Sequence, residues 1–178
     1  LVIVLSFYLA VQETGVEDFF RFITPPKYEE YVVDLWKRSR HKIGLWMQGQ
    51  MVLGVIIGIC VFLGLTLLQV KYALIFGILA AIFEIIPVFG PILAAVLPTV
   101  FAFTEGFTLG LIVLFGFILI QQFENHLIYP LVVRKIVGVP PLLVILALIV
   151  GAQLAGFWGI VLAVPGSAVL MELVNDME

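Results

Sequence analysis

Long apolar segments alternate with short polar or proline-containing interruptions along most of this 178-residue chain. Residues 46–68 are apolar over about the 20 residues that a helix needs to cross a bilayer, and residues 107–128 are expected to form another long helix that ends in polar residues. Shorter apolar runs cover residues 73–86, 91–104, 141–155 and 158–174. Gly54 and Gly58 lie one turn apart, a spacing that lets a neighbouring helix approach closely. The pattern predicts an all-α, polytopic transmembrane helical bundle.

A polar region lies on the N-terminal side of this bundle. We interpret the apolar residues 1–11 as the end of a transmembrane helix that starts before residue 1. Residues 12–44 are polar, and residues 24–43 carry apolar positions at helical spacing. Thr24 is placed to cap a helix there, and the following proline suits its first turn. We therefore expect one amphipathic helix, separate from the helix at 46–68, that lies along the membrane surface or packs under the bundle.

Prolines and glycines interrupt the expected bundle, residues 45–178, at two places. Two prolines and a glycine within residues 84–91 prevent one regular helix from continuing there. A glycine-rich turn divides the final hairpin, residues 140–174, which forms either a re-entrant hairpin or two short spans. Irregular backbone at membrane depth persists only where protein or a water-filled cavity covers it. The bundle is therefore expected to contain broken or re-entrant helices.

Composition and charge support the membrane assignment and suggest an orientation. The chain is 63% hydrophobic and 12% charged, whereas soluble domains are about half apolar and about a quarter charged. Six of its nine basic residues fall between positions 21 and 42. Basic loops stay in the cytoplasm, so we predict that residues 12–44 and the C-terminus are cytoplasmic. No basic face suited to nucleic acid is present in the sequence.

Polar residues gather where the apolar segment 107–128 ends, in the sequence QQFENH. Gln121, Glu124 and Asn125 share one helix face, and Gln122 lies on the adjacent face. Ionisable groups inside a membrane are costly and commonly mark a substrate or ion pathway. The alternative is that these side chains only reach interfacial water as the helix leaves the membrane.

A second candidate position is the carboxylate one turn before the break at 84–91. Helix breaks with a nearby carboxylate are typical of transporter binding sites, although an ordinary loop between two spans fits as well. In the final hairpin, an isolated glutamine is placed to hydrogen-bond between helices. The residues that we expect along a substrate or ion pathway are Glu84, Pro87, Gly90, Pro91, Gln121, Gln122, Glu124, Asn125 and Gln153.

Motifs for enzymatic chemistry are missing from the sequence. It contains no phosphate-binding P-loop, no His-Glu-x-x-His zinc motif and no Gly-x-Ser-x-Gly nucleophile motif. Cys60 is the single cysteine, expected to pack as a small apolar residue, and the two histidines are widely separated. We therefore expect no catalytic residues, no metal site and no cofactor.

Three motifs together resemble the AI-2E family of membrane transporters. They are GLWMQGQ at 44–50, EIIPVFGPILAAVLP at 84–98 and the stretch from QQFENHLIYP to AVP at 121–165. The resemblance implies a protein of about eight membrane segments that transports solutes, named for export of the small polar signal autoinducer-2. Some relatives are assigned to sodium/proton antiport instead. The positions that fall on the family pattern are Glu84, Pro87, Gly90, Pro91, Gln122, Glu124, Asn125, Pro130, Gly138, Pro140 or Pro141, Gly156, Gly159 and Pro165.

Three functions remain open at this point. The chain is expected to belong to a secondary transporter or exporter of a small polar metabolite in a bacterial inner membrane. The first alternative is a cation/proton antiporter that uses Glu84 or Glu124 as its titrating carboxylate. The second alternative is a non-transporting membrane scaffold. The expected partners are the lipid bilayer, a polar solute or a cation or proton, and further copies of the same chain.

Overall fold

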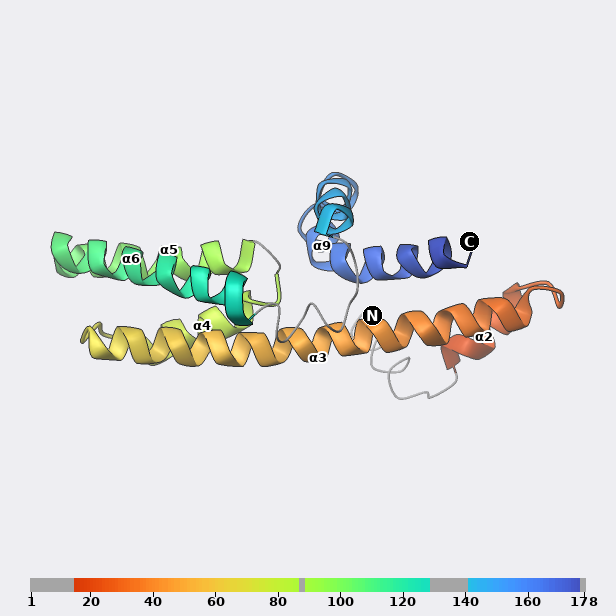
Figure 1. Ribbon diagram of the computed structural model, residues 1–178, viewed down its shortest axis with the longest axis horizontal. Helices are drawn as coiled ribbons and strands as arrows, with labels where there is room; N and C mark the ends of the chain where they lie inside the picture. The colour runs from red at the N-terminus through yellow and green to blue at the C-terminus, as the bar shows by residue number, and fades with distance from the viewer. Residues whose placement is uncertain (1–14, 87–88, 129–140, 177–178) are drawn as a thin grey trace.

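The computed structural model describes residues 15–86, 89–128 and 141–176, and within these ranges all regular structure is helical (Figure 1). Several predictions lie outside the described residues. They concern the helix at 1–11, Pro87 at the break, and Pro130, Gly138 and Pro140 on the family pattern.

Helix α2, Gly15–Ile23, packs against the start of the much longer helix α3, Glu29–Leu67. The rings of Phe20 and Trp36 lie 5.4 Å apart, and Lys37 pairs with Glu17 at 3.6 Å. The backbone N–H of Thr24 donates to the carbonyl of Phe20, at the end of α2. The prediction that Thr24 caps a helix over residues 24–43 is therefore wrong, because α3 begins at Glu29.

The predicted separation between an amphipathic helix and a spanning helix at 46–68 is also wrong. α3 continues without a break through Gly44 and is 39 residues long, about 58 Å at 1.5 Å per residue. One buried stripe runs along it, through Ser39, Trp46, Leu53 and Ile57. A single glycine inside a helix costs only about 1 kcal/mol, so this continuous stripe outweighs it. The change from a polar to an apolar sequence near residue 45 therefore lies within α3 and does not mark a boundary between two helices.

The turn from α3 to α4, Ala73–Phe83, is closed by backbone hydrogen bonds. The N–H of Val70 donates to the carbonyl of Leu65 at 2.9 Å, and the N–H of Gln69 donates to Thr66 at 3.0 Å. This is a Schellman motif, which needs a left-handed residue after the helix and usually has glycine there. Here Gln69, with φ of 58°, takes that conformation. The turn sends α4 back along α3.

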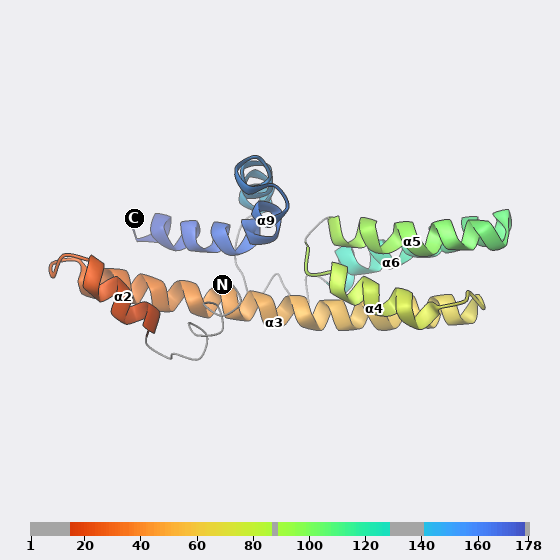
Figure 2. The same cartoon turned by 180° about the vertical axis from the view of Figure 1, so that it is seen from behind.

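Helices α3 to α6 form a bundle (Figures 1 and 2). After the break, α5, Phe89–Glu105, runs away from the end of α4, and α6, Phe107–Phe123, returns. α6 is continued by one π-helical turn, η1, over Glu124–Ile128. At the far end of the bundle, Lys71 and Glu105 pair across the two turns at 3.4 Å. The predicted break between residues 84 and 91 is confirmed, with α4 ending at Phe83.

Small residues allow α3 and α4 to pack closely. A Cβ atom at Gly54 would lie 2.7 Å from the carbonyl oxygen of Ala81, and one at Gly58 would lie 2.8 Å from that of Gly77. The predicted role of the Gly54 and Gly58 pair is confirmed. The centre of the bundle is apolar, with Leu53 1% exposed.

Helix α9, Pro141–Asn175, is divided where Ala155 and Gly156 leave helical geometry, as the glycine-rich turn predicts. Gly151 and Gly159 lie against each other across this bend. The first part of α9, before Ala155, runs across the direction of α3 (Figure 1). The part after Gly156, which we call the C-terminal arm, lies alongside α3 (Figures 1 and 2).

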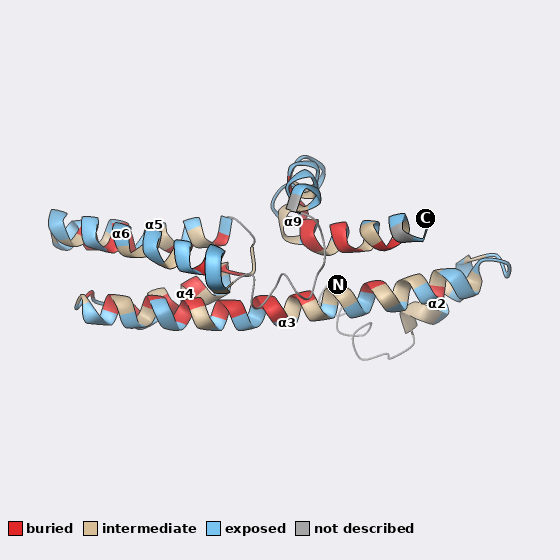
Figure 3. Ribbon diagram, in the orientation of Figure 1, coloured by how far each residue is buried: buried red, intermediate tan, exposed pale blue. Residues whose placement is uncertain are grey.

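Exposed residues cover the outer faces of the bundle and much of α9 (Figure 3), and many of them are large and apolar. Phe115 is 60% exposed, Ile75 is 53% exposed, and Cys60, expected to pack inside, is also exposed. Contiguous apolar surface of this extent is unfavourable in water and suits lipid. Among the described residues, three segments are long and apolar enough to cross a membrane: Glu29–Leu67, Phe107–Ile128 and Leu142–Val174. The fold is therefore an all-α membrane bundle.

Candidate transport site

A buried polar site lies where α3, the end of α4 and the end of α6 meet. Gln50 belongs to α3, Glu84 directly follows α4, and Glu124 begins η1. Their exposed fractions are 3%, 2% and 5%, so all three polar side chains are enclosed by protein. The site occupies the end of the bundle that contains the break, opposite the turns that carry Lys71 and Glu105.

Gln50 binds the backbone at the break. Its Nε2 donates a hydrogen bond to the carbonyl of Glu84, which lies just beyond the last residue of α4. The last carbonyls of a helix have no partner within that helix, and leaving one buried without a partner costs about 1–3 kcal/mol. The Gln50 amide therefore stabilises the broken end of α4 on α3.

Glycines bring the backbone at the break close to its neighbours. A Cβ at Gly54 would lie 3.5 Å from the Cβ of Glu84, so this glycine sits directly beneath the acidic residue. Gly90, at the start of α5, lies against the backbone of Phe83 and Glu84. A larger residue at either glycine would displace Glu84 from its position between α3 and α5.

The carboxyl groups of Glu84 and Glu124 are close neighbours at this end of the bundle. Gln121 Nε2 donates to Glu124 Oε2 at 3.3 Å. Glu84 Oε2 is buried and has no hydrogen-bond partner among the described residues. Two adjacent buried carboxylates repel each other, so the arrangement favours a proton, a cation or a hydroxyl donor between them.

The π-helical turn that begins at Glu124 changes which side chains share a face. A π-helix closes hydrogen bonds at i→i+5, and single π-turns are frequent at functional sites. Asn125 and His126 are exposed, and His126 Nδ1 lies 2.9 Å from the carbonyl oxygen of Gln122. The expected shared face of Gln121, Glu124 and Asn125 is therefore only partly formed, because Asn125 lies outside the buried site.

The residues expected along a pathway fall into two groups. Glu84, Gly90, Gln121 and Glu124 come together in the buried site. Three others are exposed, Pro91 is half-buried, and Pro87 is outside the described residues. The three exposed residues are Gln122, Asn125 and Gln153. A role in transport for any member of either group stays a prediction.

Sequence reasoning missed Gln50 as a site residue. The signal was available, since Gln50 stands among the apolar residues Trp46, Leu53 and Ile57 at the spacing of one helix face. A polar side chain on the buried face of a helix needs a partner, and here that partner is a backbone carbonyl. A second buried polar side chain is Thr99 of α5, whose hydroxyl has no partner among the described residues.

Lipid-suited outer faces, several apolar helices and a buried polar site at a helix break define the class as a polytopic membrane protein with an enclosed polar site. Comparison with known protein families identifies the family to which the chain belongs. The model of the AI-2E family transporters matches residues 1–178, and the chain belongs to this family. The resemblance drawn from the sequence motifs is confirmed.

Individual relatives agree with this assignment. The chain is 32% identical over 148 residues to "Putative transport protein YueF" of Bacillus subtilis, covering 83% of the chain and 40% of that protein. It is 27% identical to "Putative transport protein YrrI" of the same species, covering 93% and 47%. It is 34% identical over 115 residues to "AI-2 transport protein TqsA" of Escherichia coli, covering 64% and 33%. The chain thus spans less than half the length of these relatives.

Proposed function

We propose that this chain forms part of a secondary transporter that moves a small polar metabolite across a bacterial inner membrane. The observation that carries the proposal is the enclosed group of Gln50, Glu84, Gln121 and Glu124 at the break between α4 and α5. Burying such groups in an otherwise apolar bundle is costly, and proteins retain them where polar solutes or ions pass. Family membership supports the same function.

The donor and acceptor groups of the site suit a neutral solute rich in hydroxyl groups. Gln50 and Gln121 provide amides, and Glu84 Oε2 is an acceptor without a partner among the described residues. A relative is named for AI-2 transport, so autoinducer-2 is the candidate solute. Hydrogen bonds to solute hydroxyls would replace those that the solute makes with water.

The proposed orientation follows from the basic residues. Arg38, Arg40 and Lys42 lie in the N-terminal half of α3, before its long apolar part begins near Trp46. The positive-inside rule then assigns the polar half of α3, together with the C-terminal end of α9 beside it, to the cytoplasm. In this orientation the buried polar site lies toward the cytoplasmic end of the bundle.

A second candidate function is cation/proton antiport, and the facing carboxyl groups of Glu84 and Glu124 favour it. Such a pair can hold one positive partner and exchange it, which is the step that an antiporter requires. Association of several copies of the protein remains a further prediction. The interfacial position of residues 12–44 also remains a prediction.

The test is flux through the full-length protein in liposomes. Autoinducer-2 uptake and sodium-driven proton movement would be measured for wild type, Glu84→Gln and Glu124→Gln. Glu105→Gln is the matched control, because Glu105 pairs with Lys71 at the opposite end of the bundle.

We expect both site variants to lose at least about tenfold of the transport rate, equivalent to about 1.4 kcal/mol in the barrier, with Glu105→Gln unchanged. Loss of autoinducer-2 flux alone supports the metabolite transporter. Loss of proton movement, in a protein without autoinducer-2 flux, supports the antiporter. Wild-type rates of both processes in both site variants would remove this site from the transport route.

A further inference from the structure

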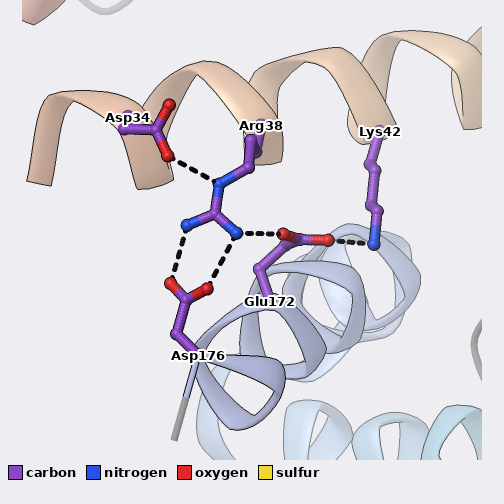
Figure 4. A network of polar contacts seen from close by, with 5 residues as sticks. All are labelled: Asp34, Arg38, Lys42, Glu172 and Asp176. Carbon is purple, nitrogen blue, oxygen red and sulfur yellow. Dashed lines mark hydrogen bonds and ion pairs between the residues drawn. The ribbon is translucent and has the colours of Figure 1, made fainter. Parts of the chain in front are cut away.

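A second polar cluster, far from the buried site, joins α3 to the C-terminal arm of α9 (Figure 4). The guanidinium of Arg38 donates two hydrogen bonds to the carboxylate of Asp176, at 2.9 and 2.6 Å, in a bidentate contact. It also donates to Glu172 at 3.0 Å. Its Nε also pairs with Asp34 at 2.9 Å. Lys42, one turn further along α3, pairs with the other oxygen of Glu172. We call Asp34, Arg38, Lys42, Glu172 and Asp176 the ionic cluster.

The ionic cluster connects segments that are 134 to 138 residues apart in the sequence. Glu172 is only 5% exposed, and its carboxylate contacts two cations, Arg38 and Lys42. Bidentate contacts between arginine and carboxylate are stronger and more directional than ordinary ion pairs. The cluster therefore fixes both the position and the rotation of the α9 arm relative to α3.

Apolar contacts beside the ionic cluster are modest. Val164 and Ala168 face α3 and belong to the same apolar core as Trp46. Small side chains bury little apolar area, so the charges form a large part of the connection. Among the helix pairs of the described residues, α9 makes its main contact with α3.

A hinge lies within α9 itself. Ala155 has φ of −138°, and Gly156 has φ of 55° and ψ of −129°, so the helical hydrogen-bond pattern is interrupted there. Hinges are commonly short non-helical segments that absorb changes in backbone angles. A change of the backbone angles at Ala155 and Gly156 would move the C-terminal arm relative to the first part of α9.

We propose that the ionic cluster is a latch, sensitive to ionic strength, that holds the C-terminal arm of α9 on α3 and releases it when the charges are screened. The side chain of Arg38 is 36% exposed and that of Asp176 is 20% exposed, so salt in solution reaches them. The screening length falls from about 30 Å at 0.01 M salt to about 3 Å at 1 M. This conformational switch does not depend on which solute the protein carries.

The test measures the distance between α3 and the arm in the full-length protein in lipid nanodiscs. Spin labels on Gly44→Cys and Val174→Cys, in a Cys60→Ala background, report the separation of the two elements. A Cβ at Gly44 would meet no atom within 4 Å, and Val174 is 47% exposed, so both sites accept a label. The labelled protein would be measured at 0.01 M and at 1 M salt, unaltered and with Arg38→Gln or Asp176→Asn.

We expect one short distance at low salt, and a separated population that grows about fivefold at high salt, the upper range for partly exposed ion pairs. Arg38→Gln and Asp176→Asn should show that population already at low salt. Lys37→Gln is the matched control, because Lys37 pairs with Glu17 of α2 and is not a member of the ionic cluster. If Arg38→Gln does not fold, Asp176→Asn decides, since it leaves Glu172 paired with Lys42. The same short distance at both salt concentrations in the Asp176→Asn protein would overturn the proposal.

Discussion

The close packing of α3 on α4 leads to a quantitative prediction for Gly54→Ala. The new methyl carbon would lie 2.7 Å from the carbonyl oxygen of Ala81, whereas ordinary contact begins at 3.4 Å. The two helices would have to separate locally by about 0.7 Å, which weakens the contacts on either side of Gly54. The atoms in the way belong to the backbone, so a change of side-chain rotamer cannot relieve the clash.

The magnitude follows from two opposing effects. Overpacking of this kind costs about 1–3 kcal/mol, while alanine stabilises a helix by about 1 kcal/mol relative to glycine. Gly64→Ala is the matched control, because it lies in the same helix and a Cβ there meets no atom within 4 Å. It gains the helix stabilisation without the clash. The two variants should therefore differ by about 1–3 kcal/mol in free energy of unfolding, with Gly54→Ala the less stable.

The assay is reversible unfolding of the full-length protein in mixed micelles, followed by far-ultraviolet circular dichroism. Gly58→Ala should behave like Gly54→Ala, because its Cβ would lie 2.8 Å from the carbonyl oxygen of Gly77. If Gly54→Ala proves as stable as Gly64→Ala, α3 and α4 do not pack as described. The position of Glu84 at the end of α4 would then be in doubt as well.

Other parts of the structure give further predictions. Gln50→Leu should lower the free energy of unfolding by about 1–3 kcal/mol in the same assay, since it leaves a buried carbonyl without its donor, whereas Gln48→Leu at an exposed position should not. Gly156→Ala should cost about 1–3 kcal/mol, because alanine is strained at φ of 55° and ψ of −129°. Hydrogen bonds from Arg38 lower the pKa of Asp176. The contribution of the Asp176 carboxylate to docking of the α9 arm should therefore be constant above about pH 4 and disappear as the pH falls through the lowered pKa. The spin-label distances between α3 and the arm measure this loss, and the Asp176→Asn protein should not show it.

The helical fold could be predicted from the sequence because its main signal is length and hydrophobicity. The runs at 46–68 and 107–128 and the break before Gly90 all correspond to observed features. The start of α3 could not be predicted in this way. A helix that passes from water into lipid changes composition on its outer face while its buried face stays the same, so composition alone suggests two helices.

The candidate site was predictable only in part. Glu84 and Glu124 were expected separately, but their meeting depends on α6 returning along α5 and α3, which local patterns do not specify. Asn125 was expected on the same face as Glu124, and the π-helical turn moves it out. The burial of Gln50 was predictable from its spacing with Trp46 and Leu53, but its partner, a backbone carbonyl at the break, was not.

The uninterrupted course of α3 has a mechanical consequence. Arg38 and Gln50 belong to one helix and are 12 residues apart, about 18 Å along its axis. A helix is stiff in torsion, so a rotation that breaks the contacts of Arg38 with α9 turns Gln50 by the same angle beneath the broken end of α4. A rotation of α3 would therefore couple the ionic cluster to the buried site that holds Glu84 and Glu124.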